Sequence, residues 1–337
     1  MKRMANVAAR GADRSSHKYG YTSSEQLKQR TPFQKFLLNF KRNWQLHLMI
    51  ALPLAYIIIF AYLPMYGIQI AFRAYTIEGG ITGSDWVGLK QFFRFFSDRQ
   101  WSRYVGNTLT ISLYSLAASF PIPIILALIL HVNEHPVLKK VTQNVSYVPH
   151  FISTVVLVGI LNQVFKPFNG LIASVAQMLG GSFNEDIRVN PDAFYHLYVW
   201  SGVWQGMGWS AIMYVAALAG VPLELHEAAK IDGASRWRRV LSVDLPASMP
   251  TVCILVILRF GSIMSVGHEK VFLMQYGTNM SKSQIISTYV YRVGLSKASN
   301  YSFGSAVGLM NSVINTSLVL LVNWITNKLS DGESGLF

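Results

Sequence analysis

The chain has 337 residues, of which 51% are hydrophobic and 13% charged, and its formal net charge is +13. An ordinary soluble domain carries about 25% charged residues, so this composition excludes that class and indicates a membrane protein. The basic excess is explained by cytoplasmic loops, which collect Lys and Arg. We expect no nucleic-acid partner, because the chain lacks the basic surface segment that such proteins carry. The single cysteine, Cys253, excludes an intramolecular disulfide.

The N-terminal segment is basic and rich in Ser, and it lacks the apolar core of a cleaved signal peptide. We therefore expect a disordered cytoplasmic tail over residues 1–45. The first apolar segment after it would act as the uncleaved signal for membrane insertion.

Six segments approach the length of about 20 apolar residues that a helix needs to cross a bilayer. The second contains Pro121 and Pro123, which a membrane helix tolerates where neighbouring helices satisfy the freed backbone groups. Between the first and second spans, aromatic and basic residues within 73–106 predict an amphipathic helix at the membrane surface. The six predicted spans are 48–72, 107–130, 146–165, 193–220, 249–274 and 303–326.

The distribution of Lys and Arg predicts the orientation. If the N-terminus is inside, the segments on the inner side hold more of these residues than those on the outer side, chiefly because of the first segment. We expect both termini in the cytoplasm of a bacterial cell, with residues 222–246 on the same side after four spans.

Residues 222–246 are polar and patterned although they lie between two apolar segments. Pro222 suits the first turn of a helix, and Gly233 permits the left-handed turn that often follows a helix end. Ser235 can cap a second helix, which we expect to stop before Pro246. The sequence predicts a helix, a sharp turn and a second helix.

The first of these helices carries a small apolar face. Leu225, Ala228 and Ala229 are spaced to share it, and Glu227 beside them offers a charge to an Arg or Lys of a partner. This pattern favours docking against another protein. A solvated loop that merely connects two spans is the alternative.

The same stretch follows a longer pattern of Glu-Ala-Ala, three residues, Gly, nine residues, an aliphatic residue, one residue and Leu-Pro. It resembles the EAA loop of permease subunits in bacterial ATP-binding-cassette (ABC) importers, with Val243 where that family usually has Ile. The resemblance covers about residues 40–328 and is strongest for sugar-importer permeases linked to oligosaccharides and polysaccharides, within the binding-protein-dependent inner-membrane component family. It implies that the coupling residues are Glu227, Ala228, Ala229, Asp232, Gly233, Leu245 and Pro246.

The resemblance also implies the fold and the partners. We expect an all-α polytopic membrane protein with six transmembrane helices of the type I ABC importer fold and a cytoplasmic coupling helix-turn-helix. Residues 46–328 would form the permease domain, followed by a cytoplasmic tail over 329–337. The expected partners are membrane lipid, a second and non-identical permease subunit, two ATPase subunits and an extracytoplasmic sugar-binding protein.

The chain has no GxxxxGK(S/T) phosphate loop and no HExxH metal motif. ATP hydrolysis must therefore take place on a separate chain, which would bind ATP and Mg²⁺. We expect that this chain is a transport subunit and not an enzyme, and that it binds no cofactor or metal of its own. It would move a carbohydrate by alternating access.

An ionisable residue within a span suggests a functional site. Arg259 falls near the middle of the predicted fifth span, and Ser262, Ser265 and Glu269 would share its helix face. This face could line the pathway of the substrate, with Arg259 donating hydrogen bonds to sugar hydroxyls. The alternative is that Arg259 serves as a structural tie to a neighbouring helix or subunit.

Further candidates combine aromatic faces with amides, which suits sugar binding. Their alternative role is in the aromatic belts of the membrane interface or in helix packing. They are Trp200, Trp204, Gln205, Trp209 and Tyr214 in the fourth span, and Asn311 and Asn315 in the sixth. Gly202 and Gly206, four residues apart, predict a close approach of another helix.

Two other transporters compete with a sugar permease. A secondary transporter predicts inverted repeats and several buried carboxylates. In this sequence only one acidic residue, Glu269, falls near the interior of a predicted span, and we find no repeat. An ABC permease for another solute, such as a peptide, would share the coupling loop. A membrane-bound enzyme predicts clustered acid, base or metal-binding residues, and the histidines are scattered along the sequence.

Overall fold

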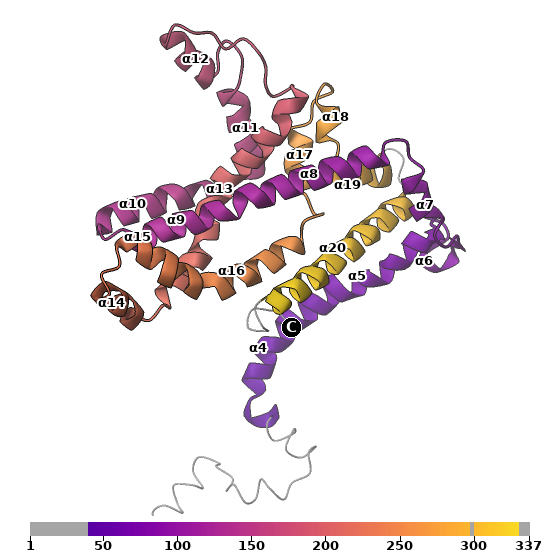
Figure 1. The fold of residues 1–337 in the computed structure, drawn as a ribbon. Helices are drawn as coiled ribbons and strands as arrows, with labels where there is room; N and C mark the ends of the chain where they lie inside the picture. The colour runs from indigo at the N-terminus through magenta and orange to yellow at the C-terminus, as the bar shows by residue number, and fades with distance from the viewer. Residues whose placement is uncertain (1–39, 297–299, 330–337) are drawn as a thin grey trace, which may run out of the picture. The chain divides into compact units, whose positions relative to one another are not determined.

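The computed structural model describes residues 40–296 and 300–329 (Figure 1). The predicted tails, 1–45 and 329–337, lie almost entirely outside these residues. Contacts divide the chain into two compact units, Met1–Gly67 and Ile68–Phe337, which are considered one at a time below.

The described part of the first unit is an apolar helix. Helix α4 (Trp44–Ile57) continues through the π-helical turn η1 (Ile58–Tyr62) into α5 (Leu63–Met65), and none of their residues is buried. The 3₁₀ turn η2 (Tyr66–Phe72) follows. A helix that is apolar all round is suited to lipid, and the stretch Trp44–Phe72 is long and apolar enough to cross a membrane, which confirms the first predicted span.

A short hairpin opens the second unit. Strands β1 (Arg73–Ala74) and β2 (Asp85–Trp86) pair antiparallel around the short helix α6 (Gly80–Gly83). Helix α7 (Lys90–Phe96) follows, and its fully buried Phe95 packs near Phe303. The predicted surface helix is therefore short and partly covered, because the residues from Trp101 onward belong to the next long helix.

Helices α8 (Trp101–Ser119) and α9 (Pro121–Val132) together form one continuous span of 32 residues. Pro121 stands at the start of α9, where its missing N–H donor is least costly. The predicted second span is confirmed, with an earlier start at Trp101.

The third predicted span is wrong in shape. Helix α10 (Pro136–Tyr147) and the 3₁₀ turn η3 (Val148–Phe151) are followed by α11 (Thr154–Val164) at an angle of 105°. The backbone stays helical through Pro149, which lies in the first turn of η3, and becomes extended at Ile152 and Ser153. The Ser153 hydroxyl then accepts a hydrogen bond from the Val156 amide, which starts a new helix.

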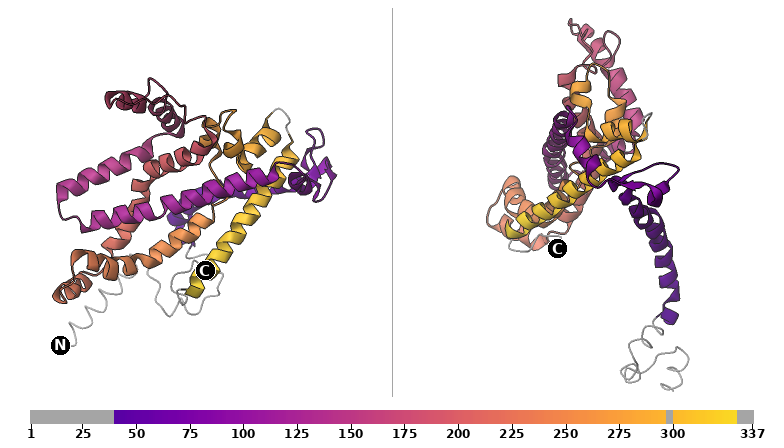
Figure 2. Two further views of the ribbon diagram at one scale, coloured as in Figure 1. Left: turned by 45° about the horizontal axis from the view of Figure 1, so that its top comes forward. Right: turned by 90° about the vertical axis from the view of Figure 1, so that its right-hand side faces the viewer.

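Helix α12 (Leu171–Met178) follows α11 and stands clear of the other helices in Figure 1 and in the right-hand view of Figure 2. The loop after it is anchored by Arg188, whose guanidinium donates to both carboxylate oxygens of Asp186 and to the Asn162 carbonyl. These hydrogen bonds hold the pKa of Asp186 below its usual range.

Helix α13 (Pro191–Ala219) forms the fourth predicted span and lies against α8, α9 and α10. The side chain of Asn190 caps it by accepting a hydrogen bond from the Asp192 amide at 2.9 Å. Within the second unit, Ala211, Tyr214 and Leu218 pack with Ala127 of α9 to form an apolar cluster.

Four helical segments follow at the place of the predicted helix-turn-helix. They are α14 (Leu223–Ile231), α15 (Arg236–Arg239), the π-helical turn η4 (Val240–Asp244) and α16 (Leu245–Phe260). Helix α14 is bent by 72° from α13. The predicted stop before Pro246 is wrong, because the helical run continues from Arg236 to Phe260. Pro246 lies in the first turn of α16, directly after the π-helical turn. Proline has no backbone N–H to donate, and its absence is tolerated at this position of a helix.

Short helices and one long helix complete the chain. Asn107 of α8 holds the short segments in place by donating to the carbonyls of Ser281 and Gln284, while Tyr195 donates to its amide oxygen. The elements are α17 (His268–Leu273), α18 (Met280–Ser283), α19 (Ile286–Val290), η5 (Tyr291–Leu295) and α20 (Tyr301–Leu329), of which α20 contains the predicted sixth span.

In the described ranges, four helices are long and apolar enough to cross a membrane, and there are up to six if each of two bent pairs is one span. The predicted helical polytopic membrane fold is confirmed. Figure 1 also shows α14 and α15 at the same end of the second unit as the connection between α9 and α10.

Candidate functional site

The coupling segment, residues 222–246, presents an uncovered surface. No residue of α14 is buried, and Leu225 and Ile231 are 49% and 87% exposed. Glu227 and Ala228 are exposed as well, while Ala229 is half-buried. Large apolar side chains left open beside an acid and small residues are typical of a protein-binding surface.

Gly233 makes the predicted sharp turn. Its φ of 76° lies in the left-handed region, and the Ala234 amide donates to the Ala229 carbonyl at 2.9 Å across the turn. In the described ranges, no atom beyond the two neighbouring residues lies within 4 Å of the position that a Cβ would take, so the backbone angle and not crowding favours glycine. Asp232 ends α14, and the Ser235 hydroxyl caps α15 by accepting from the Arg238 amide, as predicted.

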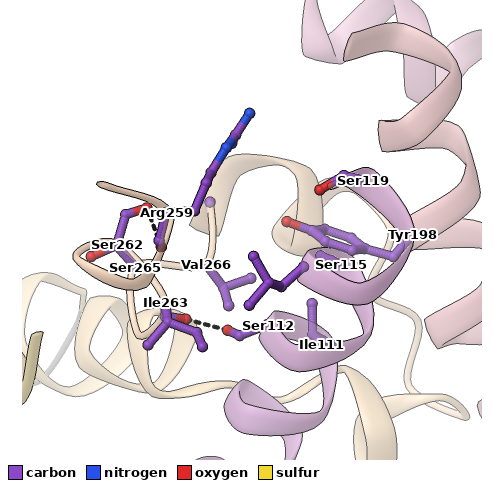
Figure 3. Close-up of a pocket in the computed structure, with 12 residues that line it drawn as sticks. Ile111, Ser112, Ser115, Ser119, Tyr198, Arg259, Ser262, Ile263, Ser265 and Val266 are labelled. Carbon is purple, nitrogen blue, oxygen red and sulfur yellow. Dashed lines mark hydrogen bonds between the residues drawn. The ribbon is translucent and has the colours of Figure 1, made fainter. Parts of the chain in front are cut away.

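A second candidate region is a polar cavity of about 240 Å³ among α8, α13 and the chain after α16. Figure 3 shows Arg259 extended from the end of α16, with Ser262 and Ser265 on the following turn and Ser115, Ser119 and Tyr198 across the cavity. Ser112 closes one side by donating to the Ile263 carbonyl. Hydroxyl groups and one guanidinium therefore face the same space.

Arg259 carries the one charge of this cavity, since none of the residues that line it, all of them described, is acidic. The side chain is exposed, and its Nη2 lies 3.4 Å from the Ser210 hydroxyl, a long hydrogen bond. The guanidinium thus retains most of its five donors for another group.

The predicted helix face around Arg259 is wrong. Helix α16 ends at Phe260, so Ser262 and Ser265 lie on a turn, and Glu269 lies exposed on α17 outside the cavity. Gly261 ends the helix where a side chain would meet Val319 of α20. Arg259, Ser262 and Ser265 still share one cavity, although a turn and not a helix brings them together.

The two predicted asparagines of α20 differ in their surroundings. Asn315 bridges to the cavity turn, because its side chain accepts from the Met264 amide and donates to Ser265, each at 3.0 Å. The side-chain oxygen of Asn311 is buried and has no hydrogen-bond partner among the described residues.

The aromatic candidates of α13 do not form one platform. Trp200 donates to the Tyr114 hydroxyl and, with Trp204, lines an apolar hollow away from Arg259. Trp209 stacks on His150, and Tyr214 is buried in the cluster with α9. Gln205 donates to the Ile152 carbonyl at 2.7 Å. Gln205 and Tyr214 thus make packing contacts with neighbouring segments. Tyr214 also lines, together with Trp209, a hollow that reaches Arg259.

Sequence reasoning missed the serines of α8. Ser112, Ser115 and Ser119 recur at three and four residues, which places them on one helix face. That spacing was the available signal, and it was hidden because serines are common in apolar helices. Tyr198 had no such signal.

A helical membrane fold with an uncovered coupling segment and a polar cavity defines a transport component. The chain belongs to the family described as "Binding-protein-dependent transport system inner membrane component", whose model matches residues 119–331. The predicted resemblance and the prediction of a transport subunit are thereby confirmed.

Two curated relatives come from Bacillus subtilis (strain 168). The polygalacturonan/rhamnogalacturonan transport system permease protein YteP is 37% identical over 304 residues, which are 90% of this chain and 94% of that protein. Protein LplB is 39% identical over 299 residues, which are 88% of this chain and 92% of that protein.

A similar fold occurs in a crystal structure of a bacterial ABC transporter involved in the import of the acidic polysaccharide alginate. The TM-score is 0.79 with 32% sequence identity, covering 88% of this chain and 99% of that chain. A second structure of the alginate transporter, in complex with its pentasaccharide-bound periplasmic protein, matches equally well at a TM-score of 0.79.

Proposed function

We propose that the chain is the transmembrane permease subunit of an ABC importer for carbohydrates, and that its substrate is an acidic oligosaccharide or polysaccharide fragment. The observation that carries the proposal is the coupling segment, where an uncovered helix with Glu227, Ala228 and Ala229 ends in a turn that only glycine makes without strain.

The coupling segment would dock on an ATPase subunit. Leu225 and Ile231 offer exposed apolar surface, and Glu227 has no ion-pair partner in the described chain. Glu227, Ala228, Ala229, Asp232 and Gly233 would enter a groove of that subunit. Leu245 and Pro246 would join the docked segment to the fifth span.

The cavity around Arg259 supports an acidic substrate. A guanidinium with free donors and no acidic neighbour in the cavity suits a carboxylate, which it can bind through two parallel hydrogen bonds. The serine hydroxyls around it suit the hydroxyl groups of a sugar ring. Two relatives are named for polygalacturonan and for alginate, and the latter is described as acidic.

The mechanism would be alternating access. An extracytoplasmic binding protein would deliver the sugar, and two ATPase subunits would bind ATP and Mg²⁺ on the cytoplasmic side, where both termini of this chain would lie. A second, non-identical permease subunit would complete the pathway. Closure of the ATPases would displace the coupling segment and change which side of the membrane the cavity faces.

The substitution Gly233→Asp tests the docking role. Asp enters the left-handed region at a smaller cost than most residues, but its carboxylate adds a second negative charge beside Asp232 on the surface that would enter the groove. In the complex reconstituted with its ATPase and second permease subunits, we expect sugar-stimulated ATP hydrolysis and uptake to fall at least about tenfold, which needs a loss of only about 1.4 kcal/mol.

Gly180→Asp is the matched control. Gly180 also has positive φ and open space around it, but it follows α12, outside the coupling segment. We expect this variant to transport normally. Equal losses in both variants, or normal transport by Gly233→Asp, would contradict the docking role.

A further inference from the structure

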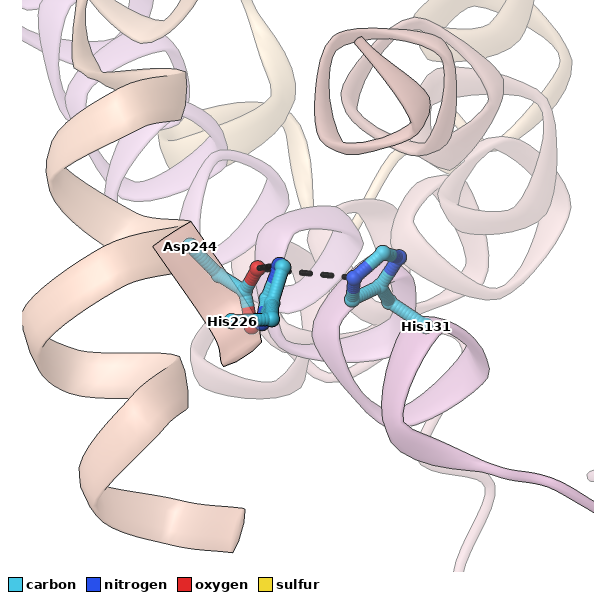
Figure 4. A group of neighbouring side chains, drawn as sticks. All are labelled: His131, His226 and Asp244. Atoms are coloured by element: carbon cyan, nitrogen blue, oxygen red, sulfur yellow. Dashed lines mark ion pairs between the residues drawn. The ribbon is translucent and has the colours of Figure 1, made fainter. Parts of the chain in front are cut away.

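Three side chains from three elements converge at the base of the coupling segment. They are His131 in the last turn of α9, His226 in α14 and Asp244 at the end of η4. The Nε2 atoms of His131 and His226 lie 3.4 and 3.2 Å from Oδ1 of Asp244. Figure 4 shows both imidazole rings turned toward this one carboxylate oxygen.

Among the described residues, this oxygen of Asp244 has no partner besides the two imidazoles. The residue is 2% exposed, and its buried Oδ1 receives no hydrogen bond within the described chain. A buried carboxylate without a hydrogen bond or a bound cation is strongly unfavourable. The cluster thus contains a buried carboxylate oxygen that faces two imidazole nitrogens and receives no hydrogen bond from the described residues.

The distances fit a tetrahedral metal site. Zn²⁺ binds imidazole nitrogen and carboxylate oxygen at about 2.0–2.2 Å, so neighbouring ligand atoms of a tetrahedron stand about 3.3–3.6 Å apart. In the structure the two nitrogen–oxygen separations are 3.4 and 3.2 Å, close to this range, and all three ligand atoms lie within 4.8 Å of one another. Mg²⁺ and Ca²⁺ require six or more ligands, nearly all oxygen, and fit this set poorly.

We propose that His131, His226 and Asp244 bind a divalent transition-metal ion of the Zn²⁺ class. The cluster opens onto a small cavity of about 120 Å³, which has room for water as the fourth ligand. The neutral imidazoles and the carboxylate would compensate one of the two metal charges.

The neighbouring charges limit the affinity. Arg236 and Arg239 line the same cavity and oppose a cation, whereas Glu134, which pairs with Arg236 at 2.9 Å, favours it. We therefore expect weaker binding than at a structural zinc site of four protein ligands. Such an ion would respond to the metal concentration around the protein.

Metal binding would join three parts of the chain that otherwise meet through packing and the surface ion pair between Glu134 and Arg236. The end of α9 belongs to the second span, His226 lies on the coupling helix α14, and Asp244 lies directly before α16. An ion held by all three would fix the coupling helix against the ends of two spans. Metal would thus regulate how far the coupling segment moves relative to the membrane.

The test measures metal binding directly. The purified full-length protein, freed of metal with a chelator, is titrated with Co²⁺ and then with Zn²⁺. We expect one equivalent of Co²⁺ to bind with the visible absorption of a tetrahedral ion, and Zn²⁺ to displace it. His131→Gln, His226→Gln and Asp244→Asn should each weaken binding at least about tenfold, because changes even outside the ligand shell cost 10–100-fold.

His135→Gln is the control, since His135 is exposed in the same connection and does not line the cavity. His226→Cys separates ligand loss from misfolding, because it keeps a ligand and should bind Co²⁺ with added thiolate absorption. Absence of stoichiometric binding, unchanged binding in the three variants, or equal loss in His135→Gln would overturn the proposal. Since the readout does not involve transport, failure here would leave the proposed transport function untouched.

Discussion

Arg259 places one guanidinium among hydroxyl groups and apolar side chains. Its hydrogen bond to Ser210 is long, so the described chain does not use most of its donors. Arginine is suited to planar carboxylates, which its fork binds with two hydrogen bonds, whereas lysine offers a point charge. Substitutions at Arg259 can therefore separate a requirement for positive charge from a requirement for the planar geometry of the guanidinium.

Substitution of Arg259 tests this distinction. We expect Arg259→Gln to reduce uptake of an acidic oligosaccharide at least about tenfold and Arg259→Lys to reduce it less, because hydrogen bonds to a charged group contribute about 1.5–3 kcal/mol. Uptake into proteoliposomes of oligogalacturonate and of a neutral oligosaccharide of the same length is the measurement.

Arg103→Gln is the control, because Arg103 is an exposed arginine at the start of α8, outside the cavity. If Arg259→Gln prevents assembly of the complex, or if it lowers uptake of both sugars equally, Arg259 is a structural tie and not a substrate contact.

At the scale of helices, α13 approaches α10 so closely that one position admits no side chain. Gly208 of α13 is buried, and a Cβ added there would overlap the backbone carbonyl of Ser146. Around Gly206, half a turn away on the same helix, no described atom beyond the backbone of its own helix and its two neighbours lies within 4 Å of the Cβ position. The two glycines provide a matched pair within one helix.

Gly208→Ala should destabilise the protein by about 1–3 kcal/mol, the usual effect of overpacking. Gly206→Ala should leave stability unchanged or raise it by up to about 1 kcal/mol, since alanine favours helix over glycine. Thermal unfolding of the detergent-solubilised protein measures both. A loss in Gly206→Ala as large as that in Gly208→Ala would contradict the assigned helix contact.

These glycines also show why part of the fold could not be predicted. The four-residue spacing of Gly202 and Gly206 predicted a close approach, yet the contact lies at Gly208, because it depends on where α10 crosses. Unbroken apolar runs such as Trp44–Phe72 and Tyr301–Lys328 were predictable from hydrophobicity alone. The bend before Thr154 was not predictable, because it depends on local hydrogen bonds. The early end of α16 was not predictable either, because it depends on contact with α20.

The candidate site likewise has parts that were predictable from the sequence and parts that were not. The turn at Gly233 and the cap at Ser235 are local and were predictable from residue type. Arg259 was identifiable as a charge in an apolar run, but its serine neighbours come from α8, more than a hundred residues earlier. The cluster of His131, His226 and Asp244 likewise needs the tertiary fold, since no spacing in the sequence relates its members.

At the scale of the whole molecule, the described spans leave most of their surface uncovered. In the most apolar window of each of the four unbroken spans, between 0% and 28% of the residues are buried. Lipid and a second permease subunit would cover the remainder. The positive-inside rule predicts which end of each span faces the cytoplasm, and this prediction can be tested directly.

Single cysteines report the orientation in a Cys253→Ala background, which removes the one native thiol. We expect Ser182→Cys, between the third and fourth spans, to react with a membrane-impermeant maleimide in intact spheroplasts. His135→Cys, between the second and third spans, should react only after lysis. Both native residues are exposed in this chain. The reversed pattern would place both termini outside.

The helical run from Arg236 to Phe260 has a consequence for how movement travels through the protein. Arg236 begins the run beside the turn at Gly233, and Arg259 stands at its other end in the cavity, 23 residues or about 35 Å away. If the run had ended before Pro246, a force on the coupling segment would have had to pass through a flexible joint. As one rod with a π-helical turn, it can act as a lever, so that a small tilt imposed on the end near the coupling segment displaces the Arg259 guanidinium directly.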